Sequence, residues 1–278
     1  MSKVWFITGC STGFGRNLAQ EVLHNGGKVA VTARNTNDVK DLSDKYSETA
    51  FAIALDVTKP EQVKDAVQKA VEKFGQIDVL VNNAGIGYFA AIEESEEDQV
   101  RRMFEINFFG LAAVTKEVLP VLRKQHSGHI INISSVGGSV AMPGIGMYNA
   151  TKFAVTGYSE SLAKELAPLG IKVTVIAPSG FRTDWAGRSA NNSKIVIDDY
   201  KESAHSIQDT IRGNSGSQPG DPVRAAQAII KIVETEDAPV RLFLGAGALK
   251  GIRNKIAEMQ TDIDAWEETT VWADNPKS

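Results

Sequence analysis

The chain has 278 residues, enough to bury a large core in one α/β domain or in two small ones. Its hydrophobic share of 42%, charged share of 23% and net charge of -4 are those of an ordinary globular protein, and favour neither nucleic acid nor a membrane as a partner. The single Cys10 excludes a disulfide within the chain, and the four histidines show no metal-ligand spacing. We therefore expect a cytoplasmic protein that acts on a small molecule and needs no metal.

Seven apolar segments of strand length follow one another along the chain, and helix-length amphipathic segments separate them. In residues 60–74, for example, apolar side chains recur with helical spacing. Nearly continuous apolar strands that alternate with helices indicate a parallel sheet covered by helices on both faces. The sequence thus predicts a single α/β domain with a doubly wound (Rossmann) sheet of seven parallel strands. The predicted strands are 3–8, 28–33, 50–55, 77–82, 129–134, 172–177 and 239–244.

The regular alternation stops at Pro178, where a polar segment rich in Asn, Ser and Gly begins. Short helical pieces are expected near residues 195–212. A connection of this length is typical of a functional lid, so residues 184–220 are predicted to form a substrate loop. Residues 1–248 are expected to form the nucleotide-binding and catalytic domain. Residues 249–278 are expected to be a charged C-terminal extension, whose role the sequence leaves open.

The first predicted strand runs into a glycine-rich turn, and an amphipathic segment follows. Glycines permit positive φ angles and close approach of a ligand, and the start of a helix offers unpaired N–H groups to a phosphate. This pattern predicts a dinucleotide site; a turn that serves only strand–helix packing is the alternative. The residues assigned to the site are Gly9, Ser11, Thr12, Gly13, Phe14 and Gly15.

Arg34 follows the second predicted strand, where a residue that contacts the adenosine ribose is expected. No carboxylate stands there. An Asp or Glu would bind the ribose hydroxyls and repel a phosphate, whereas an arginine pairs well with a 2′-phosphate. Arg34 therefore favours NADP(H) over NAD(H), and a solvated arginine at a strand end is the alternative.

Three motifs, taken in their order, resemble those of the short-chain dehydrogenase/reductase family. They are TGCSTGFG from Thr8, NNAG from Asn82 and YNATK from Tyr148. The resemblance covers about residues 1–245. It implies an enzyme that interconverts a carbonyl, either a ketone or an aldehyde, and an alcohol by hydride transfer with NAD(P). It also implies a homodimer or homotetramer.

The resemblance assigns roles to individual residues. The implied catalytic residues are Asn107, Ser135, Tyr148 and Lys152. Further contacts to the cofactor are implied for Asp56, Val57, Asn83, Ala84, Gly85, Tyr148, Lys152, Pro178, Phe181 and Thr183. The chain departs from the family pattern at Ser179, where glycine is usual after the proline, and at Phe14, where Ile or Leu is more common.

The spacing of Tyr148 and Lys152 has a chemical reason of its own. Hydride transfer to a carbonyl builds negative charge on its oxygen, which then needs a proton donor. Residues four apart share one face of a helix, so the Lys152 ammonium is expected to lower the pKa of the Tyr148 phenol. Ser135 would hold the substrate oxygen. By resemblance, Lys152 also binds the nicotinamide ribose and Asn107 anchors a water; a half-buried tyrosine beside a solvated lysine is the alternative.

The surroundings of the expected substrate position are apolar, which favours a hydrophobic ketone, aldehyde or secondary alcohol. The flanking residues are Tyr88, Met142, Ile145 and Trp185, and the residues expected in the core instead are Phe104, Phe108 and Phe109. Two other functions compete with catalysis of this kind. A non-catalytic dinucleotide-binding redox sensor would not need the acid–base residues, and a sugar-nucleotide epimerase or dehydratase would normally have a longer chain.

Overall fold

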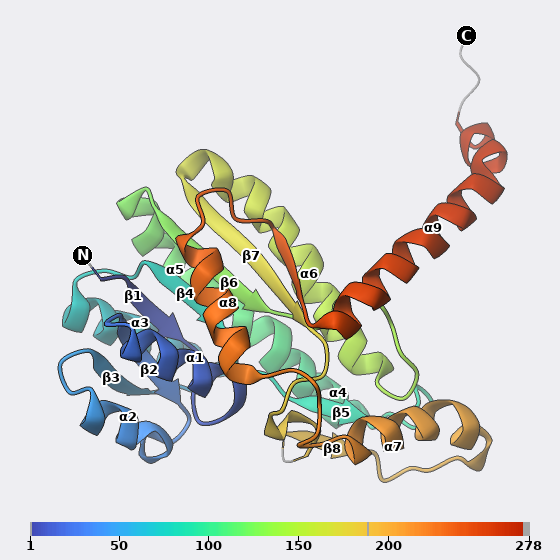
Figure 1. The fold of residues 1–278 in the computed structure, drawn as a ribbon, viewed down its shortest axis with the longest axis horizontal. Coiled ribbons are helices and arrows are strands. Elements are labelled where there is room, and N and C mark those ends of the chain that lie inside the picture. Colours follow the sequence, from blue (N-terminus) through green and yellow to red (C-terminus); the bar gives the residue numbers. More distant parts are fainter. Residues whose placement is uncertain (1, 188, 275–278) are drawn as a thin grey trace.

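The computed structural model describes residues 2–187 and 189–274. Its centre is a sheet of seven parallel strands in the order β3-β2-β1-β4-β6-β7-β9 (Figure 1). The chain starts in the middle, builds one half of the sheet outward and then crosses back to build the other half, which confirms the predicted doubly wound topology. The strands are β1 (Val4–Ile7), β2 (Lys28–Ala33), β3 (Ala50–Ala54), β4 (Val79–Asn82), β6 (Gly128–Ile133), β7 (Ile171–Pro178) and β9 (Arg241–Leu244).

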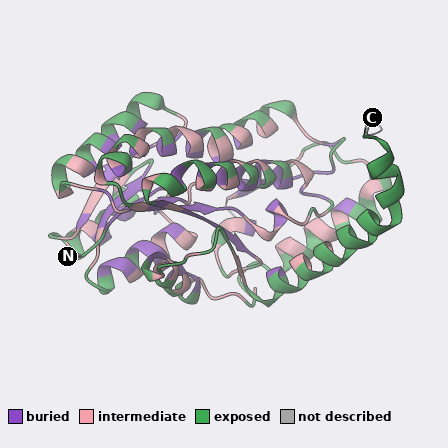
Figure 2. Ribbon diagram, turned by 90° about the horizontal axis from the view of Figure 1, so that it is seen from above, coloured by how far each residue is buried: buried purple, intermediate pink, exposed green. Residues whose placement is uncertain are grey.

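Helices cover both faces of this sheet, and Figure 2 shows that the buried residues gather along the sheet between them. On one face lie α1 (Gly13–His24), α2 (Lys40–Lys45) and α8 (Pro222–Glu234). On the other lie α3 (Pro60–Phe74), α5 (Leu111–Gln125) and α6 (Gly146–Leu166). Strand β1 shows why the strands are apolar throughout. The side chains of Trp5 and Ile7 lie in the hydrophobic core on the α1 face of the sheet, and that of Phe6 lies in the core on the α3 face.

The polar segment after β7 contains more structure than the sequence predicts. Strands β5 (Gly87–Phe89) and β8 (Ala190–Asn192) pair in a second, two-stranded parallel sheet. Helical pieces follow near the expected positions: η6 (Asp198–Tyr200), the π-helical η7 (Lys201–His205) and α7 (Ser206–Gly213). Residue 188 of the predicted lid lies outside the described residues.

A buried carboxylate fixes this segment to the body of the protein. Glu94 is 2% exposed and follows β5; its Oε1 accepts a hydrogen bond from the backbone N–H of Ile197 at 2.8 Å. The same oxygen lies 2.7 Å from Nε2 of His205. Burial alone would raise the pKa of Glu94. The hydrogen bonds from Ile197 and Ala91 and the nearby His205 outweigh this effect, so the pKa is lowered and the carboxyl group is ionised.

The C-terminal extension is one long helix, α9 (Ala246–Trp272), which begins three residues before the expected boundary at 249 and runs away from the body (Figure 1). Ala248, near its start, is buried, and the helix is exposed from residue 256 onward. Residues 275–278 lie outside the described part of the chain. In the described part, no helix combines the length and the apolar character that crossing a membrane requires.

The three phenylalanines expected in the core have different surroundings. Phe104 is half-buried at the end of α4 (Glu97–Phe104), and the ring of Phe108 packs against Tyr158 with 5.9 Å between their centres. Phe109 is 52% exposed, so the core prediction is wrong for this residue. Phe109 lies in the π-helical turn η2 (Glu105–Gly110), whose wider turn changes which side chains face inward.

The buried His129 in β6 gives the fold a predictable pH dependence. Its Nε2 lies 2.9 Å from Oγ1 of Thr174. Burial, together with the nearby Lys172 and Lys3, lowers the pKa of His129 from 6.5 to about 4. Between these pH values the unfolded chain binds a proton that the folded chain does not bind. The free energy of unfolding should therefore fall as the pH is lowered from 6.5 to 4, with a slope of up to about 1.4 kcal/mol per pH unit from this group.

The comparison protein for this prediction is His129→Gln, which keeps a hydrogen-bonding side chain but cannot titrate. Urea denaturation at several pH values between 4 and 7 should give a shallower pH dependence for this variant than for the natural chain. Parallel pH dependences would show that folding does not lower the pKa of His129.

Candidate active site

The glycine-rich turn is tied directly to the carboxyl end of β4. Oγ1 of Thr8 accepts hydrogen bonds from the backbone N–H groups of Asn83 at 2.9 Å and Ala84 at 3.0 Å. Nδ2 of Asn83 donates to the carbonyls of Thr8 at 2.8 Å and Gly9 at 3.0 Å. A Cβ atom at Gly9 would lie 2.9 Å from Cα of Ala84, and one at Gly15 would lie 2.4 Å from Nδ2 of Asn83. The two motifs can meet only because these positions are glycines.

The N-terminus of α1 is open to an anion. The helix begins at Gly13, whose φ of +61° suits glycine. The preceding residue, Thr12, makes no side-chain hydrogen bond to the helix end, and the first turn contains no acidic residue. Unpaired N–H groups and the positive end of the helix dipole make such a terminus a good phosphate site. The predicted residues Ser11, Thr12 and Gly13 therefore fit the pyrophosphate of a dinucleotide.

Arg34 and Asp56 lie at the ends of the neighbouring strands β2 and β3. Burial raises the pKa of the Asp56 carboxyl, but hydrogen bonds from the backbone and side chain of Thr58 and the positive charge of Arg34 outweigh that effect, so the pKa is lowered. Val57 beside it is buried, whereas Arg34 is exposed. The exposed guanidinium of Arg34 thus lies at the same edge of the sheet as the glycine-rich turn.

The segment after β7 lies over the glycine-rich turn. The ring of Phe181 packs edge-on against Phe14, with 5.1 Å between the ring centres. The Thr183 side chain lies 3.7 Å from where a Cβ atom of Gly13 would be. Phe14 thus contacts a second predicted cofactor-binding residue, a contact that the sequence pattern does not reveal.

The departure at Ser179 also has a structural role. Pro178 ends β7, and the backbone N–H of Ser179 donates to the carbonyl of Leu244 in β9 at 3.0 Å. A Cβ atom on Gly245 would lie 2.4 Å from Oγ of Ser179, so this serine occupies the space beside the start of α9.

Tyr148 and Lys152 lie one turn apart on α6, and they are only 6% and 5% exposed. The Ser135 side chain lies close enough to the Tyr148 hydroxyl to oppose the burial that raises the pKa of this phenol. Oγ of Ser135 also accepts a hydrogen bond from the backbone N–H of Gly137 at 3.0 Å, in the turn η3 (Val136–Gly138). Nζ of Lys152 donates to the carbonyl of Ile133 at 2.9 Å and lies 5.7 Å from the centre of the Tyr148 ring. The structure therefore brings Ser135, Tyr148 and Lys152 together.

Asn107 lies in the π-helical turn η2, a type of irregularity frequent at functional sites. Its Oδ1 accepts from the backbone N–H of Ile86 at 2.8 Å, and its Nδ2 donates to the Ile86 carbonyl at 2.9 Å and to Oγ1 of Thr151 at 3.1 Å. A Cβ atom at Gly85 would lie 3.2 Å from Oδ1 of Asn107 and 3.7 Å from Nζ of Lys152. Gly85, the glycine of the NNAG motif, thus gives the side chains of Asn107 and Lys152 the space that they need.

Burial changes the acid–base properties of the pair on α6. It raises the pKa of Tyr148 above its ordinary value, and the Ser135 side chain only partly opposes this effect. Burial also lowers the pKa of Lys152 to about 8. The expected lowering of the Tyr148 pKa by Lys152 is wrong for this structure, because the ammonium donates to a carbonyl and desolvation dominates. Tyr148 therefore holds its proton at neutral pH.

Aromatic and aliphatic side chains enclose Tyr148. The ring of Trp185, in the turn η5 (Asp184–Ala186), lies 4.8 Å from the Tyr148 ring and 5.8 Å from the Phe89 ring, measured between centres. Met142 and Ile145 belong to the same apolar cluster. Tyr88 is part of this wall rather than a free polar group, because its hydroxyl accepts a hydrogen bond from the backbone N–H of Glu96 at 3.0 Å.

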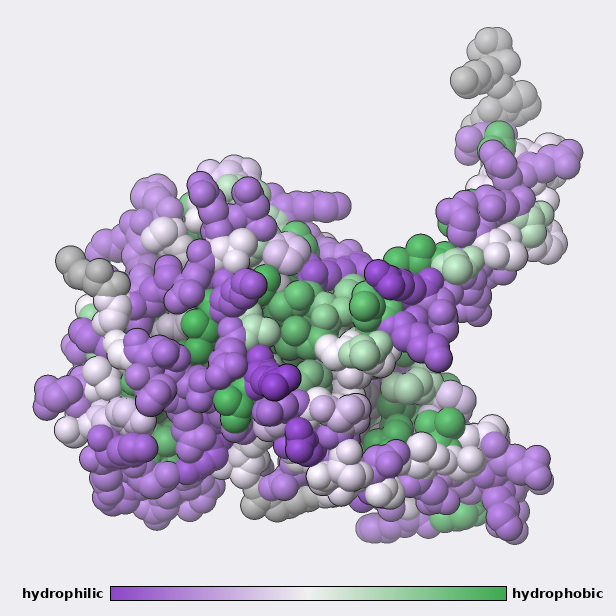
Figure 3. Space-filling view, viewed as in Figure 1, coloured by the Kyte–Doolittle hydropathy of each residue, from purple (hydrophilic) through white to green (hydrophobic). Residues whose placement is uncertain are grey.

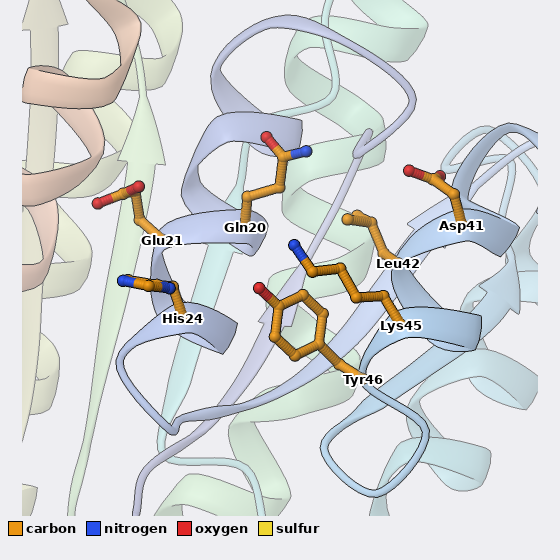
Figure 4. A pocket seen from close by; sticks show the side chains of 7 residues that line it. All are labelled: Gln20, Glu21, His24, Asp41, Leu42, Lys45 and Tyr46. Carbon is orange, nitrogen blue, oxygen red and sulfur yellow. The ribbon is translucent and has the colours of Figure 1, made fainter.

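A hollow of about 340 Å³ opens between α1 and α2 (Figure 4), and it lies apart from these residues. Its lining consists of Gln20, Glu21, His24, Asp41, Leu42, Lys45 and Tyr46, which are not among the predicted site residues. Within residues 2–187 and 189–274, no three His, Cys, Asp or Glu side chains gather in a way that could hold a metal ion.

Known proteins are similar to this chain in both sequence and fold. A family model described as short chain dehydrogenase matches residues 3–194. The chain is 39% identical to the oxidoreductase BOA17 of Botryotinia fuckeliana, over 98% of this chain and 99% of that protein. It is 36% identical to the 3-ketodihydrosphingosine reductase of Bacteroides thetaiotaomicron, over 87% and 88%. A short-chain dehydrogenase from Streptomyces avermitilis superimposes with a TM-score of 0.92, at 39% identity over 98% of each chain.

Two further solved structures contain a nicotinamide nucleotide. The protein ElxO with NADP bound is 30% identical, with a TM-score of 0.74 over 90% of this chain and all of that one. The 3-ketoacyl-(acyl-carrier-protein) reductase of Brucella melitensis, complexed with NADH, is 27% identical, with a TM-score of 0.75 over 88% and 98%. The chain belongs to the short-chain dehydrogenase/reductase family and is an oxidoreductase.

Thr8 is a residue for which the sequence suggested no role, and it yields a test of how the site is assembled. Thr8→Val keeps the shape of the side chain but leaves the partly buried N–H groups of Asn83 and Ala84 without their acceptor. We expect the free energy of unfolding to fall by about 2–4 kcal/mol. NADPH binding, measured by fluorescence titration, should weaken as well. Thr8→Ser keeps the hydroxyl and should stay close to the natural protein. A loss confined to Thr8→Ser would mean that the methyl group, not the hydrogen bonds, holds the motifs together.

Proposed function

We propose that this enzyme uses NADP(H) to interconvert a carbonyl compound, a ketone or an aldehyde, and the corresponding alcohol. The observation that supports this proposal most is the buried group of Ser135, Tyr148 and Lys152 at the carboxyl edge of the sheet, beside the open end of α1. The nicotinamide, when bound, supplies or accepts the hydride. The side chains of the protein have to bind the substrate oxygen, move one proton and exclude water.

The three side chains divide this work. In the direction of reduction, the Ser135 hydroxyl holds the substrate oxygen by a hydrogen bond, and the Tyr148 phenol donates its proton to that oxygen. The raised pKa of Tyr148 keeps the proton on the phenol until negative charge develops nearby. Lys152, with a pKa of about 8, can lose a proton near neutral pH, which suits it to reprotonate Tyr148. Asn107 would anchor a water molecule that takes part in this proton transfer, as the family resemblance implies.

The cofactor-binding residues of the proposal follow the carboxyl edge of the sheet. The glycine-rich turn from Gly9 to Gly15 would hold the pyrophosphate, and Asp56 and Val57 the adenine. Asn83, Ala84 and Gly85 would line the ribose, and Pro178, Phe181 and Thr183 the nicotinamide. Arg34 is the reason for preferring NADP(H), because it is exposed at the strand end where the 2′-phosphate of the adenosine would lie.

The substrate of the proposal is a small hydrophobic molecule, because the residues around Tyr148 form an apolar cluster. Figure 3 shows apolar surface in the hollow between the root of α9 and the segment that carries α7. Residues 184–220 would act as the lid of this site, within a catalytic unit of residues 1–248. The cytoplasmic location and the absence of a metal stay predictions.

We further propose a homodimer or homotetramer. Phe109 of η2 and Phe153 of α6 are 52% and 45% exposed, and these two elements pack against each other. Two exposed aromatic rings on neighbouring helices are typical of a contact surface.

Replacing Tyr148 by Phe tests the proposed acid. The variant lacks only the hydroxyl, so turnover of a ketone or aldehyde should fall by about 10²–10⁴-fold while the affinity for NADPH stays the same. Tyr158→Phe is the matched control on the same helix, because Tyr158 packs against Phe108 away from the site. Activity in the Tyr148 variant at the level of this control would place the proton donor elsewhere.

Replacing Arg34 by Ala tests the cofactor preference. Loss of a charged hydrogen-bond partner costs about 1.5–3 kcal/mol, so the affinity for NADPH should fall by roughly 10- to 100-fold. The affinity for NADH, which has no 2′-phosphate, should stay the same and serves as the internal control. Fluorescence titration of both nucleotides measures the difference. Unchanged NADPH affinity would contradict the role of Arg34.

A panel of hydrophobic ketones, aldehydes and alcohols, assayed with both nucleotides, would define the substrate class. The same panel separates the enzyme from a redox sensor: a protein that binds NADPH and turns over none of the compounds would favour the sensor.

A further inference from the structure

The long helix α9 has a repeating apolar face. Apolar residues recur along it at alternating intervals of three and four positions, the heptad pattern of a coiled coil. This seam consists of Leu249, Ile252, Ile256, Met259, Ile263 and Trp266. A helix of 27 residues is about 40 Å long, so the seam extends over most of its length.

The body of the protein contacts the start of α9 beside Gly251, and it leaves Leu249 and the outer seam residues exposed. There, a Cβ atom at Gly251 would lie 3.6 Å from Val136 and 3.9 Å from Val140, and the main contacts of α9 are with β9 and η3. Farther along, Ile256, Met259, Ile263 and Trp266 are 60%, 50%, 57% and 64% exposed. Figures 1 and 3 show this part of the helix projecting from the body, with apolar atoms at its surface. Such a continuous exposed seam is typical of an interface.

The charges on α9 are separated along its length. The half next to the body carries the basic residues Lys250, Arg253 and Lys255. The outer half carries the acidic residues Glu258, Asp262, Asp264, Glu267 and Glu268. A parallel pair of such helices would place like charges together, whereas an antiparallel pair places the basic half of each helix beside the acidic half of the other. Three positive and five negative charges also make the helix net acidic (3 − 5 = −2), which disfavours an anionic membrane as its partner.

We propose that α9 pairs with α9 of a second copy of this chain in an antiparallel two-helix coiled coil. One register fits every residue of the seam: Leu249 faces Trp266, Ile252 faces Ile263, and Ile256 faces Met259. Each pairing occurs twice, so that six apolar layers form. In the same register Lys255 of each copy lies beside Asp262 of the other.

This pairing is independent of the catalytic proposal, because it uses none of the residues assigned to substrate or nucleotide. It also differs from the surface around Phe109 and Phe153, so both contacts can exist in one assembly. We expect the two contacts to join different pairs of copies, so loss of the α9 pairing should halve the mass of the assembly.

The main experiment compares two double variants with equal added charge. Ile256→Glu with Ile263→Glu places carboxylates in the seam, and Asn254→Glu with Thr261→Glu places them two positions earlier in the same heptads, on the outer face. Sedimentation equilibrium should show a twofold lower mass for the seam variant and the natural mass for the control. NADPH titration checks that both variants are folded. An unchanged mass in the seam variant, or the same loss in both variants, would overturn the proposal.

A charge exchange tests the antiparallel register. Lys255→Glu alone brings carboxylates together across the pair, and Asp262→Lys alone brings ammonium groups together, so each should raise the dissociation constant of the α9 contact. The double variant should restore it. Failure of the double variant to recover, when both single variants dissociate, would overturn this register.

Binding to vesicles of phosphatidylcholine and phosphatidylserine tests the alternative that α9 binds a membrane. If the natural chain sediments with these vesicles, the seam variant does not, and both have the same mass in solution, then α9 is a membrane-binding helix and the proposed pairing is wrong.

Discussion

The close approach of two strand ends is the constraint on which the rest of the site depends. The ends of β1 and β4 meet because Gly9 and Gly15 have no side chains, and Thr8 and Asn83 tie them by reciprocal hydrogen bonds. This contact directs α1 so that its open N-terminus lies at the carboxyl edge of the sheet. It also sets the course of the chain through Gly85, beside which the side chains of Asn107 and Lys152 find space. One backbone contact therefore positions both the proposed phosphate-binding end and the proposed proton-transfer end of the site.

Burial gives the second half of the site its chemical character. The charged forms of Tyr148 and Lys152 are both disfavoured away from water, so the pKa of the phenol rises and that of the ammonium falls. Trp185 contributes to this environment because its ring covers the Tyr148 ring. A proton held on a buried phenol next to a serine hydroxyl is ready for transfer when negative charge appears on a bound oxygen. The apolar cover and the acid–base properties are thus two results of the same packing.

The sequence predicts the parts of this structure that depend on local periodicity. A strand buried on both faces must be apolar throughout, as β1 is, and the spacing of apolar residues in α3 requires a helix. Strands β5 and β8 have only three residues each and join segments about a hundred positions apart, so no local pattern reveals them. The exposure of Phe109 depends on one π-helical turn, and the raised pKa of Tyr148 depends on burial by residues distant in the sequence, with the Trp185 ring among its neighbours. These features need the tertiary structure.

The turn η5 touches both ends of the site. Thr183 precedes it above the glycine-rich turn, Trp185 within it covers Tyr148, and the Trp185 N–H donates to Oγ1 of Thr183 at 3.4 Å. A movement that uncovers Tyr148 therefore also displaces the residue above the phosphate-binding end. In the proposed site, a nucleotide at the glycine-rich turn and a product at Tyr148 would both touch this short segment, so we expect their release to be coupled through the fold.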